Sequence, residues 1–253
     1  MPDGKASPRS TANKPGFENI DAIKFDDSIR KIRLDEATLT RNHVITDQID
    51  PSVRTAYKML RTRLMQRMRA NGWNSLAVTS ATQGDGKTLT ALNLAISMAG
   101  DVNHNVCLVD LDLRHSSVSS YLGFEPGKGI SDCLLSGYPV KKALVNPNIE
   151  RLTILPNARQ VAHSSELIST PEMQKLSQQL AADPNRIVIY DMPPILSADD
   201  ALAFGPMIDA FLLVVAEGKT SRTDTMKACE LLENLNVIGT LLNRSDEKTA
   251  SYY

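Results

Sequence analysis

The chain has 253 residues, of which 42% are hydrophobic and 23% charged, which is enough for one α/β domain with a substantial core. Its 28 Lys and Arg against 29 Asp and Glu give a net charge of -1, which argues against a general nucleic-acid-binding protein, since those are usually basic. Three separated cysteines match neither a disulfide framework nor a metal-binding spacing, and no run of about 18 apolar residues predicts a membrane span. The N-terminus lacks the apolar core of a signal peptide, so we expect a cytoplasmic protein.

The polarity of the chain divides it into three parts. Residues 1–50 are polar without a sustained period, and we expect a flexible or partly ordered segment whose first ~20 residues are disordered. A single folded domain is expected over 51–244, followed by a short flexible tail, 245–253. The domain opens with a helix, because apolar residues recur at helical spacing until Gly72.

Apolar strand-like runs then alternate with helical patterns. The expected strands cover residues 75–80, 105–113, 151–157, 186–192, 210–218 and 236–244. The expected helices between them cover residues 87–99, 164–182, 199–207 and 221–235. Runs rich in Val, Ile and Leu that are separated by helices predict an α/β fold with a doubly wound, mostly parallel sheet flanked by helices. Such sheets bind ligands at the carboxyl ends of their strands.

The segment "SATQGDGKT" joins the first of these strands to the next helix and has the pattern of a phosphate-binding loop. Gly84 and Gly86 would let the backbone approach phosphates, and the amides at the helix start would stabilise their charge. Lys87 would contact the outer phosphates, and Thr88 would offer a hydroxyl to Mg²⁺. The alternative is a simple glycine turn with a solvated lysine.

Acidic residues end two of the expected strands. Asp110 and Asp112 follow "VCLV", where alternation would place both carboxylates on one side, and Asp191 ends "IVIYD". Two carboxylates this close are unfavourable unless a cation lies between them. Beside a phosphate loop, these acids are candidate Mg²⁺ partners, although each alone could be a capping or turn residue.

Together these motifs resemble one branch of the P-loop NTPases, the deviant Walker proteins, which include partition and septum-site ATPases. The bacterial tyrosine kinases (BY-kinases) of capsule and exopolysaccharide synthesis are the closer match. Thr82 stands where the partition ATPases have a second lysine, and the chain ends in tyrosines. The segments 129–137, 163–176 and 239–244 also resemble that family.

This resemblance implies an ATP-dependent protein-tyrosine autokinase that regulates polysaccharide polymerisation or export. It implies that Lys87 contacts phosphates, that Thr88, Asp112 and Asp191 hold Mg²⁺, and that Asp110 orients the tyrosine hydroxyl or accepts its proton. These four charged residues form the expected catalytic group. The residues expected to contact nucleotide are Gln83, Gly84, Asp85, Gly86, Lys87, Thr88, Leu89, Asn243 and Arg244, with Asn243 recognising the adenine base.

The tail carries the expected phosphate acceptors, Tyr252 and Tyr253. The nine residues after Arg244 reach ~30 Å when extended, so the tail could visit a neighbouring active site. The alternative is a frayed terminus with accidental aromatic residues.

The expected partners follow from the basic helix that opens the domain and from the resemblance to the kinase family. The family's oligomer motif Glu-x-x-Arg-x-x-Arg aligns with Thr55, Lys58 and Arg61, so Lys58 and Arg61 are candidate oligomer contacts in a helix that could otherwise present a solvated face. The resemblance implies a homo-oligomer, a membrane adaptor of the polysaccharide co-polymerase type, a tyrosine phosphatase, and a location at the inner face of the plasma membrane. Two other functions compete: an ATPase switch of the partition type, and a nucleotide-binding scaffold.

Overall fold

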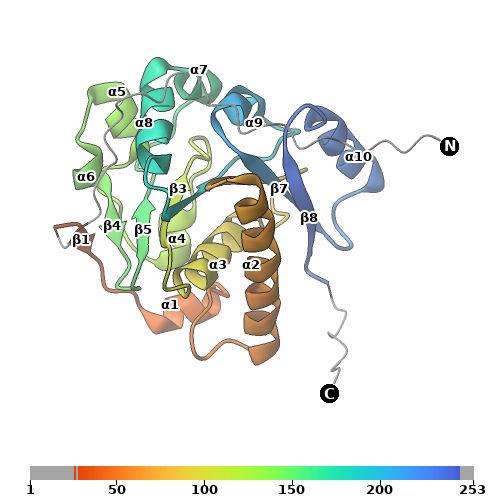
Figure 1. Ribbon diagram of the computed structural model, residues 1–253, viewed down its shortest axis with the longest axis horizontal. Helices are drawn as coiled ribbons and strands as arrows, with labels where there is room; N and C mark the ends of the chain where they lie inside the picture. The colour runs from red at the N-terminus through yellow and green to blue at the C-terminus, as the bar shows by residue number, and fades with distance from the viewer. Residues whose placement is uncertain (1–25, 27, 246–253) are drawn as a thin grey trace.

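One eight-stranded sheet forms the centre of the molecule (Figure 1). The computed structural model describes residue 26 and residues 28–245. The strands are β1 (Arg30–Lys31), β2 (Ser75–Ser80), β3 (Asn105–Asp110), β4 (Val145–Asn146), β5 (Leu152–Leu155), β6 (Arg186–Asp191), β7 (Ala210–Ala216) and β8 (Val237–Asn243). Their spatial order is β1-β4-β5-β3-β6-β2-β7-β8, and every neighbouring pair is parallel except β4 and β5. The predicted doubly wound, mostly parallel α/β fold is therefore confirmed.

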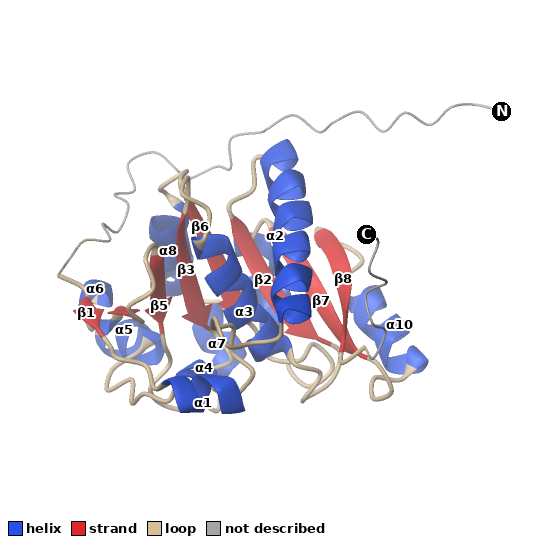
Figure 2. Cartoon of the chain, turned by 90° about the horizontal axis from the view of Figure 1, so that it is seen from below, coloured by secondary structure: helices blue, strands red, loops and turns tan. Residues whose placement is uncertain are grey.

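Helices cover both faces of this sheet (Figures 1 and 2). They are α1 (Glu36–Arg41), α2 (Pro51–Asn71), α3 (Lys87–Ala99), α4 (Val118–Leu122), α5 (Ile130–Ser136), α6 (Val140–Ala143), α7 (Ser164–Ile168), α8 (Pro171–Ala181), α9 (Asp200–Phe204) and α10 (Arg222–Leu231), with a 3-10 turn, η1 (Gly205–Met207). Two apolar clusters separate the layers: α1 to α4 pack on one face and α5 to α10 on the other. Alternation along β2 supplies both, because Leu76 and Val78 join the first cluster and Ala77 the second.

The prediction of one helix over 164–182 was wrong. The structure has α7 and α8 instead, separated at Ser169 and Thr170. Pro171 begins α8, and the Thr170 side chain accepts a hydrogen bond from the backbone N–H of Met173. A proline disfavours a helical residue before it, which explains the interruption. The predicted helix over 199–207 is likewise divided into α9 and η1.

Backbone pairing and side-chain hydrogen bonds join the segment before α2 to the domain. Strand β1 pairs with β4 and extends the sheet. The Asn93 side chain, on α3, accepts a hydrogen bond from the Ile45 N–H at 2.9 Å and donates one to the His43 carbonyl at 3.1 Å. The helix that follows the phosphate loop therefore holds this N-terminal segment against the domain.

The described part of the chain contains no helix that combines the length and the apolar character needed to cross a membrane.

Candidate nucleotide and phosphoryl-transfer site

The predicted phosphate loop lies between β2 and α3, at the carboxyl edge of the sheet. Gly84 and Gly86 both adopt positive φ, at 78° and 96°. Residues with a side chain rarely adopt the φ of Gly86, and a Cβ there would also collide with the side chain of Asn243 unless that side chain moved. The buried Asp85 carboxylate accepts hydrogen bonds from the backbone N–H and the hydroxyl of Thr82, at 2.8 and 2.9 Å. The loop is therefore braced internally by its own side chains.

Lys87 begins α3 and points its ammonium group into the acidic cluster. Its Nζ lies 2.7 Å from Asp112 Oδ2 and 3.5 Å from Asp191 Oδ1. Burial alone would lower the pKa of Lys87, but the carboxylates of Asp191, Asp112 and Asp110 outweigh burial and raise it. The lysine therefore stays charged and is a cation available to polyphosphate.

The three aspartates are buried side by side at the ends of two neighbouring strands. Asp110 on β3 lies opposite Asp191 on β6 in the sheet register. Burial and the charge of Asp191 raise the pKa of Asp110 well above its ordinary range, and burial likewise raises the pKa of Asp191. The Oδ2 atom of Asp110 accepts a hydrogen bond from the Val118 N–H at 3.1 Å, while its Oδ1 atom is buried with no hydrogen-bond partner among the described residues. The site thus has a surplus of negative charge and an unpaired oxygen.

These features fit a divalent cation that is held together with phosphate. Thr88 Oγ1 donates a hydrogen bond to Asp191 Oδ2 at 2.7 Å, which places a hydroxyl beside the carboxylates. Within the described residues, no group of three or more carboxylate, thiol or imidazole side chains forms a complete metal cage. Mg²⁺ usually takes one or two carboxylates and completes its shell with water and substrate phosphates, so an incomplete protein shell suits it.

We expect Asp110→Asn to stabilise the protein in the absence of nucleotide and metal. The ordinary pKa of an aspartate is near 3.8, and the folded state raises that of Asp110. Between these two values the folded state binds more protons than the unfolded state, so stability falls as pH rises through this window. Removing the carboxylate should therefore raise the thermal midpoint at pH 7–8, by about 2–4 °C per kcal/mol gained, with a smaller gain toward pH 4.

This result is checked by calorimetry in EDTA, with Glu172→Gln as an exposed carboxyl-to-amide control. A lower midpoint for Asp110→Asn at pH 8 would show that the carboxylate stabilises the fold.

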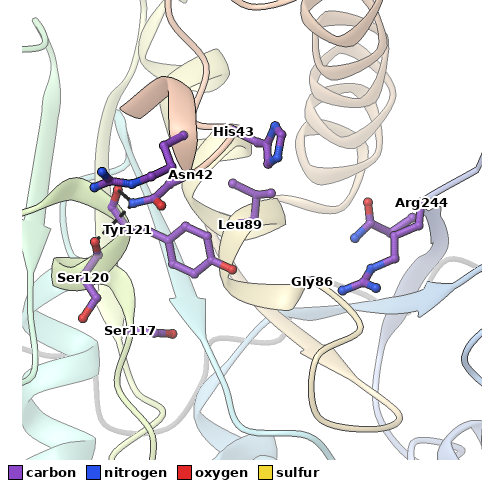
Figure 3. Close-up of a pocket in the computed structure, with 10 residues that line it drawn as sticks. Asn42, His43, Gly86, Leu89, Ser117, Ser120, Tyr121 and Arg244 are labelled. Carbon is purple, nitrogen blue, oxygen red and sulfur yellow. Dashed lines mark hydrogen bonds between the residues drawn. The ribbon is translucent and has the colours of Figure 1, made fainter. Parts of the chain in front are cut away.

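Two adjoining pockets open above the loop. One, of about 400 Å³, contains Lys87, Thr88 and Asp112 in its wall, whereas Asp110 and Asp191 lie buried beneath it. The other, of about 600 Å³, surrounds the start of α3 between the N-terminal segment, α4 and the end of β8 (Figure 3). Its lining is Arg41, Asn42, His43, Gly86, Leu89, Ser117, Ser120, Tyr121, Asn243 and Arg244. Together the two pockets offer space for a polyphosphate and for an attached nucleoside.

The structure brings together most of the residues that the sequence predicted for nucleotide. Gln83, Gly84 and Arg244 line the smaller pocket, and Leu89 and Asn243 line the larger one. Asp85 does not line either of these pockets, because its side chain points into the loop.

Sequence analysis did not find Ser117 or Tyr121, which line both pockets. The Asn42 side chain donates a hydrogen bond to the Tyr121 carbonyl at 2.9 Å (Figure 3). These residues belong to α4 and the turn before it, a short segment without a motif, so no signal in the sequence could have identified them.

The remaining candidates lie away from these pockets. Lys58 is exposed on α2, whereas Arg61 donates a hydrogen bond to the Ser97 carbonyl at 2.7 Å, near the end of α3. An oligomer contact at either residue stays a prediction. Tyr252 and Tyr253 lie outside the described residues.

Comparisons with known proteins agree with this geometry. The ParA family, described as "NUBPL iron-transfer P-loop NTPase", matches residues 73–247. The tyrosine-protein kinase YwqD of Bacillus subtilis is 31% identical over 189 residues, which cover 74% of this chain and 79% of YwqD.

Two solved structures share the fold. The chimerical protein CapA2B2 has a TM-score of 0.74 at 24% identity, with 86% of this chain and 93% of that one covered. The kinase domain of the Escherichia coli tyrosine kinase ETK has a TM-score of 0.70 at 23% identity, with 89% and 95% covered.

The fold and the site define a P-loop protein that binds a nucleotide with a divalent metal. Lys87 and Thr88 follow the glycine loop, and acidic strand ends face them. With the similarity to YwqD added, the chain belongs to the bacterial tyrosine kinases.

Proposed function

We propose that this kinase binds ATP with Mg²⁺ and transfers the γ-phosphate to tyrosines of its own tail, mainly between neighbouring copies. One observation carries the proposal: Lys87 and Thr88 converge on Asp112 and Asp191 in and below the wall of a single pocket. Phosphoryl transfer requires chiefly positioning and charge neutralisation, and this arrangement supplies both.

In the proposed reaction, the phenolic oxygen forms a bond to the γ-phosphorus while the bond from that phosphorus to the β–γ bridging oxygen breaks, and ADP leaves. Asp110 accepts the phenolic proton, a role that its raised pKa favours because a higher pKa makes the carboxylate a stronger base. Thr88, Asp112 and Asp191 would hold Mg²⁺, which neutralises phosphate charge. Lys87 would exchange its ion pair with Asp112 for the phosphates, which also uncovers the carboxylates beneath it.

We place the nucleoside in the larger pocket. Leu89 offers an apolar side chain there, and Asn243 borders it from the end of β8. The Asn243 amide donates a hydrogen bond to the Asp85 carbonyl at 2.9 Å, so recognition of adenine by this residue would use its remaining hydrogen-bonding capacity.

The tail begins beside the phosphate loop. Arg244 donates a hydrogen bond to the Gly84 carbonyl at 2.9 Å, and only nine residues follow it. Extended, they reach about 30 Å, a length compatible with transfer within one chain or between copies.

Mixing two variants tests the proposal and separates these routes. Lys87→Met keeps the tail but lacks the phosphate-binding cation. The double variant Tyr252→Phe/Tyr253→Phe keeps the site but lacks the acceptors. With γ-labelled ATP and Mg²⁺, we expect label on the tail of the Lys87→Met chain only when both variants are present, read by mass spectrometry of differently tagged chains.

Tyr138→Phe serves as a control for loss of a tyrosine elsewhere and should leave tail labelling unchanged. Equal labelling of the double variant and the wild type would contradict the tail assignment. Release of all label as free phosphate, with none on tyrosine, would support the partition-type ATPase instead, and neither product would support a scaffold role.

We further propose that the kinase acts in polysaccharide polymerisation or export, at the inner face of the plasma membrane and through a membrane adaptor. Membership of the bacterial tyrosine kinases supports this setting. A homo-oligomer with contacts at Lys58 and Arg61, and reversal by a tyrosine phosphatase, belong to the same proposal; no nucleic-acid partner is expected.

A further inference from the structure

Three consecutive carbonyls of the phosphate loop each accept a hydrogen bond from a side chain that comes from the far end of the chain. The donors lie at least 136 residues away, after β7 and at the end of β8. The pairs are Lys219 Nζ with the Gln83 carbonyl, Arg244 Nη2 with the Gly84 carbonyl at 2.9 Å, and Asn243 Nδ2 with the Asp85 carbonyl at 2.9 Å.

This pattern determines where the loop amides point. A peptide unit is planar and its C=O and N–H groups point in opposite directions. The N–H groups of the same three peptide units, those of residues 84–86, therefore point away from the side chains that hold the carbonyls. Gly86 is the N-cap of α3 and makes no side-chain cap hydrogen bond, so the first amides of the helix are also available to a ligand. Backbone N–H groups of a turn and of a helix N-terminus together suit an anion.

Lys219 is the member of this set that neither the motifs nor the pocket lining identifies. Its Nζ also lies 3.5 Å from Asp85 Oδ1, a carboxylate buried within the loop. The approach is close, because a Cβ on Gly84 would lie 2.6 Å from this Nζ. The ammonium group therefore balances the charge of Asp85 while it holds the neighbouring carbonyl.

The backbone of Arg244 also has an unusual conformation. It adopts a φ of 59°, which is uncommon for a residue with a side chain. The contact with the Gly84 carbonyl accompanies this conformation.

We propose that Lys219 is a positioning residue for polyphosphate. By fixing the Gln83 carbonyl and neutralising Asp85, it keeps the amide of Gly84 aimed at the ligand, together with the amides that Arg244 and Asn243 orient. The inference rests on the proposed nucleotide site. It assigns Lys219 no contact with the reacting atoms.

The test uses the full chain and two ligands, fluorescent Mg-ADP and inorganic tripolyphosphate as its competitor. Lys219→Ala should weaken both about tenfold, the size expected from the loss of one charge-assisted hydrogen bond. Because tripolyphosphate has no base, an equal loss for both ligands locates the defect at the loop. Lys219→Arg should recover affinity to within about twofold, since a guanidinium group also donates to a carbonyl and balances Asp85.

Lys227→Ala, an exposed lysine on α10, is the matched control and should bind both ligands like the wild type. Wild-type affinity in Lys219→Ala would overturn the inference while leaving the nucleotide site intact. Loss of Mg-ADP binding with tripolyphosphate binding retained would also overturn it, because the defect would then lie at the nucleoside. If the wild type binds neither ligand, the proposed function fails with it.

Discussion

Lys87→Met should reduce transfer of phosphate to tyrosine about a thousandfold. A unit charge pair at 4 Å contributes about 4 kcal/mol at an effective dielectric constant near 20, and about 1.4 kcal/mol corresponds to a tenfold change in rate. Lys87 is also the cation that faces Asp110, Asp112 and Asp191, so methionine would leave three buried carboxylates without it. The initial rate of labelling with γ-labelled ATP measures the effect.

Lys175→Met, an exposed change of the same kind on α8, should retain the wild-type rate. Because loss of a buried cation can destabilise the fold by about 3–5 kcal/mol, Lys87→Arg is tested beside it. Arginine keeps the charge but places a planar group where the loop holds a compact ammonium, so we expect it to fold and still lose most activity. A labelling rate near that of the wild type in both variants would refute the role of Lys87.

Asp191→Asn should lower transfer at least about a hundredfold and weaken its dependence on Mg²⁺. Both oxygens of Asp191 are engaged, one near Lys87 Nζ and one accepting from Thr88 Oγ1. An amide would present an NH₂ group to one of them and remove the charge that favours a divalent cation. Labelling rates measured across a Mg²⁺ titration report both effects.

The control for this change is Glu172→Gln, which removes an exposed carboxylate that lines neither of the two pockets and should leave the Mg²⁺ titration unaltered. Asp191→Asn with an unchanged Mg²⁺ midpoint and rate would place the metal elsewhere.

The long elements of the fold were predictable because a long buried strand or helix shows an extended apolar pattern in the sequence. Strand β2 has the predicted bounds, since a parallel strand covered on both faces must be apolar throughout. Short elements contain too few residues to show such a pattern. Strand β1 contains two residues and exists through its pairing with β4, and α4 is fixed partly by the Asn42 side chain, which donates to carbonyls of Ser120 and Tyr121.

The residues of the site also differ in whether the sequence predicts them. The loop and Asp191 are local motifs that each follow or end a predicted strand, and the carboxyl ends of parallel strands meet at one edge of the sheet, so their meeting was predictable. Tyr121 and Lys219 reach the loop only through tertiary packing, at sequence separations that no pattern links. The guanidinium of Arg61 donates to the Ser97 carbonyl within the same chain, a contact that the basic pattern of the helix did not indicate, and the oligomer contact at Arg61 stays a prediction.

The order of the strands has a consequence for how this kinase could be recruited. Strand β1 closes one edge of the sheet and β8 the other. The chain thus enters the domain and leaves it at opposite flanks. A partner that bound the β1 edge would leave the β8 edge, where the tail begins, accessible to an adjacent molecule. Anchoring and substrate delivery would then occupy separate surfaces and need not compete.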